Sequence, residues 1–195
     1  MYGTTNNWLE GYTDADGSLQ EHQHAISGYI FLINWGAILW SSKKQEIVTL
    51  LTAKSEYVAA TYSAKEALWL HRMLSEIFNL ITEPIALYSN SQSAIAMTKD
   101  GSYHAWTKHI NIRYHLIRFI VQNSSINLIY CLTEEMTADI LTKALPNAKV
   151  KHFANSLGLH PTWGGVLKVM THWMCHNSTS KLVLTALWLH TYSNK

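Results

Sequence analysis

Apolar residues in the first quarter of the chain form short runs rich in β-forming side chains, and these runs predict three strands. They cover residues 9–13, 29–34 and 36–42, and a glycine stands at the start of the second and of the third. The triplet Asn34-Trp35-Gly36 is typical of a tight hairpin connection. We therefore expect the second and third strands to pair with each other.

The pattern becomes helical after residue 50. Residues 37–83 contain neither glycine nor proline, and between residues 53 and 78 apolar side chains recur at helical spacing. These side chains are Tyr57, Ala60, Ala64, Ala67, Leu68, Leu74 and Phe78. Glu56 stands beside this stripe at the beginning of the helix, so its carboxylate is expected either to cap the helix or to take part in chemistry.

Helices and strands alternate in the rest of the chain. The expected elements are a strand at 85–88, a helix at 91–99, a helical stretch at 107–121, a strand at 126–132 and a helix at 137–145 that ends at Pro146. This order predicts an α/β fold in which helices cover a mixed sheet. Polar clusters follow three of the strands, where sites in such sheets gather.

The composition is that of a folded protein of ordinary size. The 195 residues fit one domain or one domain plus a tail, and 48% of them are hydrophobic. A net charge of +2 does not indicate a strongly basic nucleic-acid-binding protein, and two cysteines exclude a disulfide framework. No signal peptide is visible, and no apolar stretch reaches the ~20 residues of a spanning helix. We therefore expect an intracellular protein, cytoplasmic or nuclear, without a membrane partner.

Taken alone, Asp14 is typical of a turn after a strand and Glu56 of a charge at a helix N-terminus. A series of motifs around them changes this interpretation. In order, they are GYTDAD at 11–16, SGY at 27–29, WSSKKQ at 40–45, SEY at 55–57, KEALWL at 65–70, QSAIA at 92–96, TKHI at 107–110, IRYH at 112–115 and ADILTKALP at 138–146. In these motifs and their order, about residues 8 to 160 resemble the ribonuclease H domain of copia-type retrotransposon Pol polyproteins.

The resemblance implies the fold and the reaction of that family. The fold is a ribonuclease H-like, five-stranded mixed sheet, with the first three strands antiparallel and helices on both faces. The reaction is hydrolysis of the RNA strand of an RNA–DNA hybrid with two Mg²⁺ ions, for which Mn²⁺ can substitute. Two divalent cations held about 4 Å apart need negatively charged oxygen ligands, and the family supplies four carboxylates.

Three of the four carboxylates are present. By resemblance, Asp14, Glu56 and Asp139 are catalytic residues and metal ligands, whereas Asn90 holds the fourth catalytic position. Asparagine keeps one oxygen but loses a unit charge. A charge about 4 Å from a divalent ion is worth several kcal/mol, which corresponds to about a thousandfold in rate. The sequence therefore predicts a ribonuclease H that is weak or inactive.

Nucleic-acid contacts are expected from four further residues. By resemblance, Ser91 and Gln92 follow the strand that approaches the minor groove of the hybrid. Lys43 and Lys108 are candidates for phosphate contacts, although as isolated surface charges they are equally compatible with a solvated role. Three functions therefore stand as alternatives: a residual magnesium-dependent nuclease, a non-catalytic binder of nucleic acid, and an inert retroelement remnant.

The resemblance also divides the chain. Residues 1–160 are expected to form the ribonuclease H-like domain, and residues 161–195 are expected to be read-through sequence or disordered. His172, Cys175 and His176 lie in this tail, but three ligands without a fourth at suitable spacing are a weak indication of zinc. We expect the reverse transcriptase that is fused to such domains in the polyprotein to be missing here.

Overall fold

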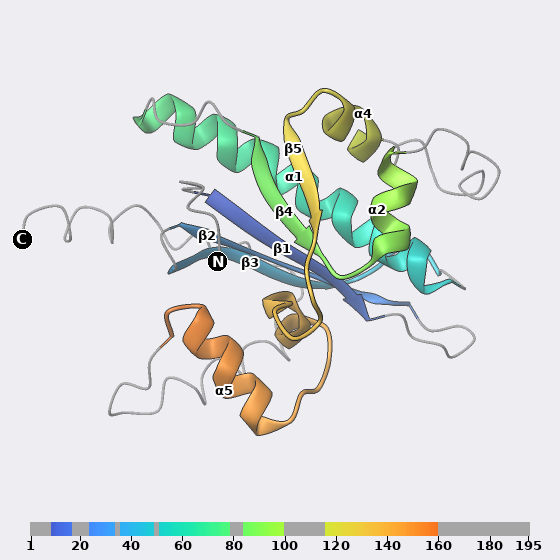
Figure 1. Cartoon of the computed structure of the whole chain (residues 1–195), viewed down its shortest axis with the longest axis vertical. Coiled ribbons are helices and arrows are strands. Elements are labelled where there is room, and N and C mark those ends of the chain that lie inside the picture. Colours follow the sequence, from blue (N-terminus) through green and yellow to red (C-terminus); the bar gives the residue numbers. More distant parts are fainter. Residues whose placement is uncertain are drawn as a thin grey trace, which may run out of the picture.

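The computed structural model describes residues 9–16, 24–33, 36–48, 51–78, 84–99 and 116–159, and five strands within these ranges form one mixed sheet. The strands are β1 (Leu9–Asp16), β2 (Ile26–Ile33), β3 (Gly36–Lys44), β4 (Ile85–Ser89) and β5 (Ile126–Tyr130). Their order across the sheet is β3-β2-β1-β4-β5 (Figure 1). The first three are antiparallel, and β4 pairs parallel with both β1 and β5. This topology confirms the expected ribonuclease H-like sheet and the predicted β2–β3 hairpin pairing.

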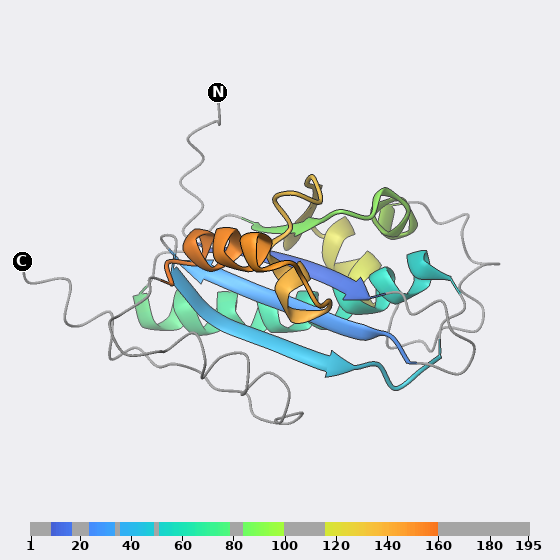
Figure 2. The ribbon, with the colours of Figure 1, turned by 90° about the horizontal axis from the view of Figure 1, so that it is seen from below.

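Helices cover both faces of the sheet, as predicted. One face carries α1 (Thr52–Phe78), α2 (Gln92–Lys99) and α4 (Leu116–Gln122). The other carries the short 3-10 helix η3 (Thr137–Leu141) and α5 (Asn147–Ser156). Figures 1 and 2 show the two layers from perpendicular directions, with α5 and α1 on opposite sides of the strands.

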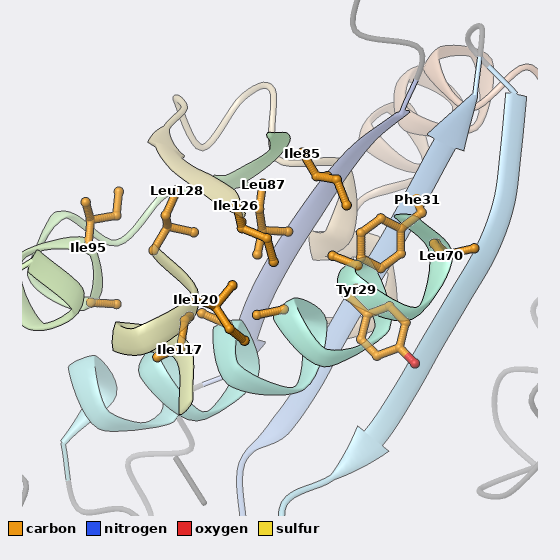
Figure 3. Close-up of a cluster of buried hydrophobic side chains, with 14 of the residues drawn as sticks. Tyr29, Phe31, Leu70, Ile85, Leu87, Ile95, Ile117, Ile120, Ile126 and Leu128 are labelled. Carbon is orange, nitrogen blue, oxygen red and sulfur yellow. The ribbon is translucent and has the colours of Figure 1, made fainter. Parts of the chain in front are cut away.

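The main hydrophobic core lies between the sheet and the helices α1, α2 and α4. Ala60, Ala64 and Ala67 are fully buried along one stripe of α1, where their small side chains let the helix approach the strands closely. They belong to the same buried cluster as large strand residues, among them Phe31 and Leu87. Figure 3 shows leucines and isoleucines of this cluster from β4, β5, α2 and α4. The apolar stripe predicted for residues 53–78 is therefore the face of α1 that packs on the sheet.

A smaller core lies on the opposite face. Ile30 and Leu32 of β2 pack there with Leu141 of η3 and with Leu157, which follows α5. Side chains alternate between the two faces along a strand, so β2, with helices on both sides, is buried at six consecutive positions. This double burial explains why β2 reads as a continuous apolar run.

Several predicted boundaries differ from the structure near the polar cluster. β1 continues past residue 13 to Asp16, because residues 14–16 pair with β2. The single helix expected at 137–145 is wrong: η3 ends at Leu141, and a separate, unpredicted helix α5 begins after Pro146. Proline fits this position because its fixed φ suits a helix start. Of the stretch expected at 107–121, α4 forms the end, whereas 107–115 lies outside the described residues.

Every element of both cores lies between residues 9 and 159. The domain boundary predicted at residue 160 and the tail 161–195 lie outside the described residues. Across the described ranges, no helix combines the length and apolar character that crossing a membrane requires.

Candidate active site

Asp14 lies on the central strand β1, and its side chain is fully buried. In the strand register it stands opposite Gly28 of β2. The preceding residue, Thr13, faces α1, where its hydroxyl accepts a 2.7 Å hydrogen bond from the Ser63 hydroxyl. Because side chains alternate along a strand, Asp14 faces the opposite side of the sheet, toward η3.

Glu56 lies in the first turns of α1 and contacts β1 beside Asp14. Its Oε2 accepts a 3.0 Å hydrogen bond from the backbone N–H of Ala15. Burial and the neighbouring charge of Asp14 raise the pKa of Glu56 to about 9, against a smaller opposing effect of Lys143. Glu56 therefore carries a proton at neutral pH when no metal ion is bound.

Asp139 reaches the same place from η3. Its carboxylate is almost completely buried and accepts a 3.0 Å hydrogen bond at Oδ1 from Nζ of Lys143. Burial and the charge of Asp14 raise the pKa of Asp139, and Lys143 opposes this shift. Asp14 and Asp139 are thus neighbouring carboxylates whose mutual repulsion favours a cation between them.

Asn90 follows β4 directly and also contacts Asp14. Its Nδ2 donates a long hydrogen bond of 3.4 Å to Oδ1 of Asp14. With its nitrogen toward the carboxylate, the amide is a hydrogen-bond donor here. The position expected to hold the fourth acid therefore contributes a neutral hydrogen bond to Asp14.

The structure adds two residues that the sequence did not indicate as site residues, Thr142 and Lys143. The Thr142 hydroxyl donates a short hydrogen bond to Oδ2 of Asp14. Nζ of Lys143 lies 3.3 Å from Oδ1 and 3.1 Å from Oδ2 of Asp14. Burial by itself lowers the pKa of Lys143, but the charges of Asp14 and Asp139 outweigh it and raise this pKa. The sequence feature that could have identified Thr142 and Lys143 is their position in the motif at 138–146, three and four residues after Asp139.

The other three predicted catalytic residues, Glu56, Asn90 and Asp139, therefore lie near Asp14, whereas the predicted nucleic-acid residues are spread over different elements. The Ser91 hydroxyl accepts a 3.2 Å hydrogen bond from the backbone N–H of Ala94 and so caps α2, and Gln92 is exposed in the first turn. Lys43 is exposed near the end of β3, 3.8 Å from Glu46. Lys108 lies outside the described residues.

A divalent cation fits this carboxylate pair in charge and in ligand type. Mg²⁺ prefers oxygen ligands, and the oxygens of Asp14 and Asp139 already converge on one cation, the ammonium of Lys143. Within the described ranges, no three Asp, Glu, His or Cys side chains stand close enough together to hold a metal ion as they are. Metal ligation by Asp14, Glu56 and Asp139 therefore stays a prediction that requires a rearrangement.

Gly28 lets η3 approach Asp14, and a side chain at this position is expected to destabilise the protein. A Cβ there would lie 2.7 Å from Cγ2 of Thr142 and 3.0 Å from Cβ of Leu141. We expect Gly28→Ala to lower the free energy of unfolding by about 1–3 kcal/mol, because η3 must move outward. Urea unfolding of the full chain measures this change.

Gly36→Ala is the matched control, because the nearest atom to its new Cβ would be the Ile33 carbonyl oxygen at 3.5 Å, an ordinary contact. We expect its free energy of unfolding to stay within about 0.5 kcal/mol of the natural value. Equal losses in both variants would contradict the close approach of η3 at Gly28.

No protein-family model matches the chain. The chain is 42% identical over 161 residues to the retrovirus-related Pol polyprotein from transposon TNT 1-94 of Nicotiana tabacum. This alignment covers 82% of this chain and 12% of the relative. The chain is 30% identical over 165 residues to the Pol polyprotein of transposon RE2 of Arabidopsis thaliana, covering 83% of this chain and 11% of the relative. The chain thus spans about a tenth of the curated relatives that it matches.

Among solved structures, the chain is similar to the N-terminal RNase H domain of Rv2228c from Mycobacterium tuberculosis, solved as a fusion with maltose-binding protein. The identity is 15% and the TM-score is 0.48. The alignment covers 76% of this chain and 96% of the other.

Proposed function

The chain belongs to the ribonuclease H domains of copia-type retrotransposon Pol polyproteins, and on this premise we propose that it is an RNA–DNA hybrid ribonuclease whose catalysis is impaired. One observation carries the proposal. Asp14 and Asp139 share the ammonium of Lys143, and Glu56 accepts a hydrogen bond from Ala15 next to Asp14. The side chain at the fourth position, Asn90, donates to Asp14. The ancestral activity is hydrolysis of the RNA strand of the hybrid, and the loss of one acid weakens it.

The carboxylates would hold the metal and the neutral amide would not. Divalent ions, when bound, would activate the attacking water and stabilise the leaving oxygen. Asp14 and Asp139 supply the negative charge for the ions, and Glu56 adds a third carboxyl group once it loses its proton. At Asn90 an amide supplies no charge, so the site lacks one of the four negative charges that the family reaction requires.

Contacts to the hybrid would come from residues around this site. Ser91 and Gln92 lie directly beyond Asn90 at the N-terminus of α2, close in sequence to the fourth position. Such a place suits a contact to the 2′-hydroxyls of the RNA strand. Lys43 and Lys108 would add phosphate contacts, whose contribution decreases as the salt concentration rises.

A non-catalytic binder of nucleic acid is the second candidate. One observation favours it: the polar groups around Asp14 satisfy one another without a metal ion, through Thr142, Lys143 and Asn90. A site of this kind can persist in a protein that only binds the hybrid. Its mark would be salt-dependent binding to the hybrid without any cleavage.

Cleavage of a labelled RNA–DNA hybrid by the full chain, in Mg²⁺ and in Mn²⁺, tests the proposal. We expect slow cleavage that the Asp14→Asn variant abolishes, because this change removes the buried charge at the centre of the site. Hybrid binding by the same variant should persist and should weaken with salt.

Two results would contradict the proposal. If the Asp14→Asn variant cleaves at the natural rate, a different site carries the activity. If neither protein binds the hybrid at low salt, nucleic acid is not the partner.

A further inference from the structure

The ammonium of Lys143 occupies the position between two buried carboxylates where a bound cation is expected. Its Nζ lies 3.0 Å from Oδ1 of Asp139 and 3.1 Å from Oδ2 of Asp14. The two carboxylate side chains are 3% and 0% exposed, whereas the lysine side chain is 34% exposed. The lysine therefore reaches from the rim of the site to its buried centre.

The backbone after η3 fixes this position. The N–H groups of Thr142 and Lys143 both donate to the carbonyl of Asp139, at 3.2 and 3.0 Å. The Ser42 hydroxyl of β3 donates a 2.7 Å hydrogen bond to the carbonyl of Leu141, and Gly28 leaves room for η3 on the sheet. The turn that carries Lys143 is thus packed against β2 and β3. The Lys143 side chain points toward Asp14.

The buried charge of the two carboxylates favours such a cation. Asp14 otherwise accepts hydrogen bonds from Thr142 and Asn90, which are neutral donors. A buried carboxylate pair without a counter-charge is costly, and removing one partner of a buried ion pair is strongly destabilising. Among the described residues, Lys143 is the cationic side chain that forms ion pairs with both Asp14 and Asp139.

We propose that Lys143 is an intramolecular counter-cation that holds Asp14 and Asp139 together without metal, and that a divalent ion binds this pair only by displacing the lysine. The inference rests on the proposed function, because it concerns the same carboxylates. It adds a competition between Lys143 and free metal ions for the two carboxylates. Lys143 thereby lowers the affinity of the site for metal ions. It also makes the metal-free site stable enough to stay assembled.

Mn²⁺ titration of the full chain by calorimetry, beside the Lys143→Met variant, tests the competition without measuring cleavage. Methionine keeps the length and packing of the side chain and removes its charge. Each charge-assisted hydrogen bond that Mn²⁺ no longer has to break corresponds to roughly tenfold in affinity. We expect the variant to bind Mn²⁺ roughly tenfold to a hundredfold more tightly than the natural chain does.

Two controls accompany this variant. Lys151→Met makes the same charge change at an exposed position of α5, and we expect its affinity to equal that of the natural chain. Lys143→Arg keeps the charge, so we expect it to bind Mn²⁺ less tightly than Lys143→Met does. In metal-free buffer, Lys143→Met should lower the Tm by roughly 5–10 °C, and Mn²⁺ should restore it.

Refolding of a destabilised Lys143→Met variant by Mn²⁺ also supports the inference, because the metal then takes the place of the ammonium. Equal Mn²⁺ affinities of the natural chain and Lys143→Met overturn the inference alone, and the ribonuclease proposal, which is judged by hybrid cleavage, stands. No Mn²⁺ binding by any of the proteins overturns the inference together with the metal site of the proposed function.

Discussion

The Asn90→Asp variant is expected to cleave an RNA–DNA hybrid about a thousandfold faster than the natural chain in Mg²⁺. The change places a fourth negative charge beside Asp14, at the position where the amide now donates its 3.4 Å hydrogen bond. A unit charge about 4 Å from a divalent ion is worth several kcal/mol at an effective dielectric constant near 20, and each 1.36 kcal/mol is tenfold in rate. Initial rates on a labelled hybrid, measured with the full chain, check this prediction.

Asn90→Ala is the matched control, because it removes the amide without adding charge, and we expect no gain in rate from it. Adding Asp14→Asn to the Asn90→Asp variant should abolish the restored activity. A second readout is stability: without metal, the new carboxylate repels Asp14, so Asn90→Asp should lower the Tm, and Mg²⁺ should raise it again. If Asn90→Asp and Asn90→Ala cleave equally slowly, the missing charge is not what limits catalysis.

The second large effect is on the pH dependence of stability, and it arises from Glu56. The pKa of Glu56 is about 9 in the folded chain, against an ordinary value of 4.5. Between these values the folded state holds a proton that the unfolded state has released, so the free energy of unfolding decreases as the pH rises. At 1.36 kcal/mol per pH unit the full effect has an upper limit of about 6 kcal/mol.

Urea unfolding of the natural chain and of Glu56→Gln in metal-free buffer between pH 5 and pH 9 checks this expectation. The variant cannot ionise at this position, so its stability relative to the natural chain should increase by several kcal/mol across the range. Taking the difference removes the contribution of Asp139, whose pKa is also raised. Lys143, with its raised pKa, loses its contribution only as the pH rises through that value, above the range measured.

The control is Glu76→Gln, an exposed glutamate near the other end of α1. Because this variant leaves Glu56 and Asp14 in place, it should not reproduce the large pH-dependent difference expected for Glu56→Gln. If Glu56→Gln follows the natural chain at every pH, Glu56 is already ionised at neutral pH, and its burial beside Asp14 does not control its charge.

The long helix and the strands could be predicted from the sequence because each has a clear local pattern of apolar residues. Residues 53–78 carry an uninterrupted helical stripe of small and large apolar side chains, and the structure contains α1 over almost the same range. The strands were predicted for the same reason, since β2 is buried on both faces and its apolar run is continuous. In both cases the residues that set the local structure are also the residues that pack in the core.

The segment around Asp139 could not be predicted in this way. Its local sequence is compatible with a single helix to Pro146, yet the helical turn ends at Leu141. The decisive contacts come from distant strands, namely the Ser42 hydroxyl on the Leu141 carbonyl and the space left at Gly28. Periodicity carries no information about such contacts, because their partners lie about a hundred residues away in the chain.

By itself, the sequence determined the class of fold, the family and the replacement of an acid by Asn90, because these are properties of pattern and residue type. Only the tertiary structure decided how the charges at the site are balanced. It buries Asp14 and Asp139 side by side and places Lys143 between them. The physical reason is that ionisation and metal affinity depend on distance and on exclusion of water, and both are set when remote segments pack together.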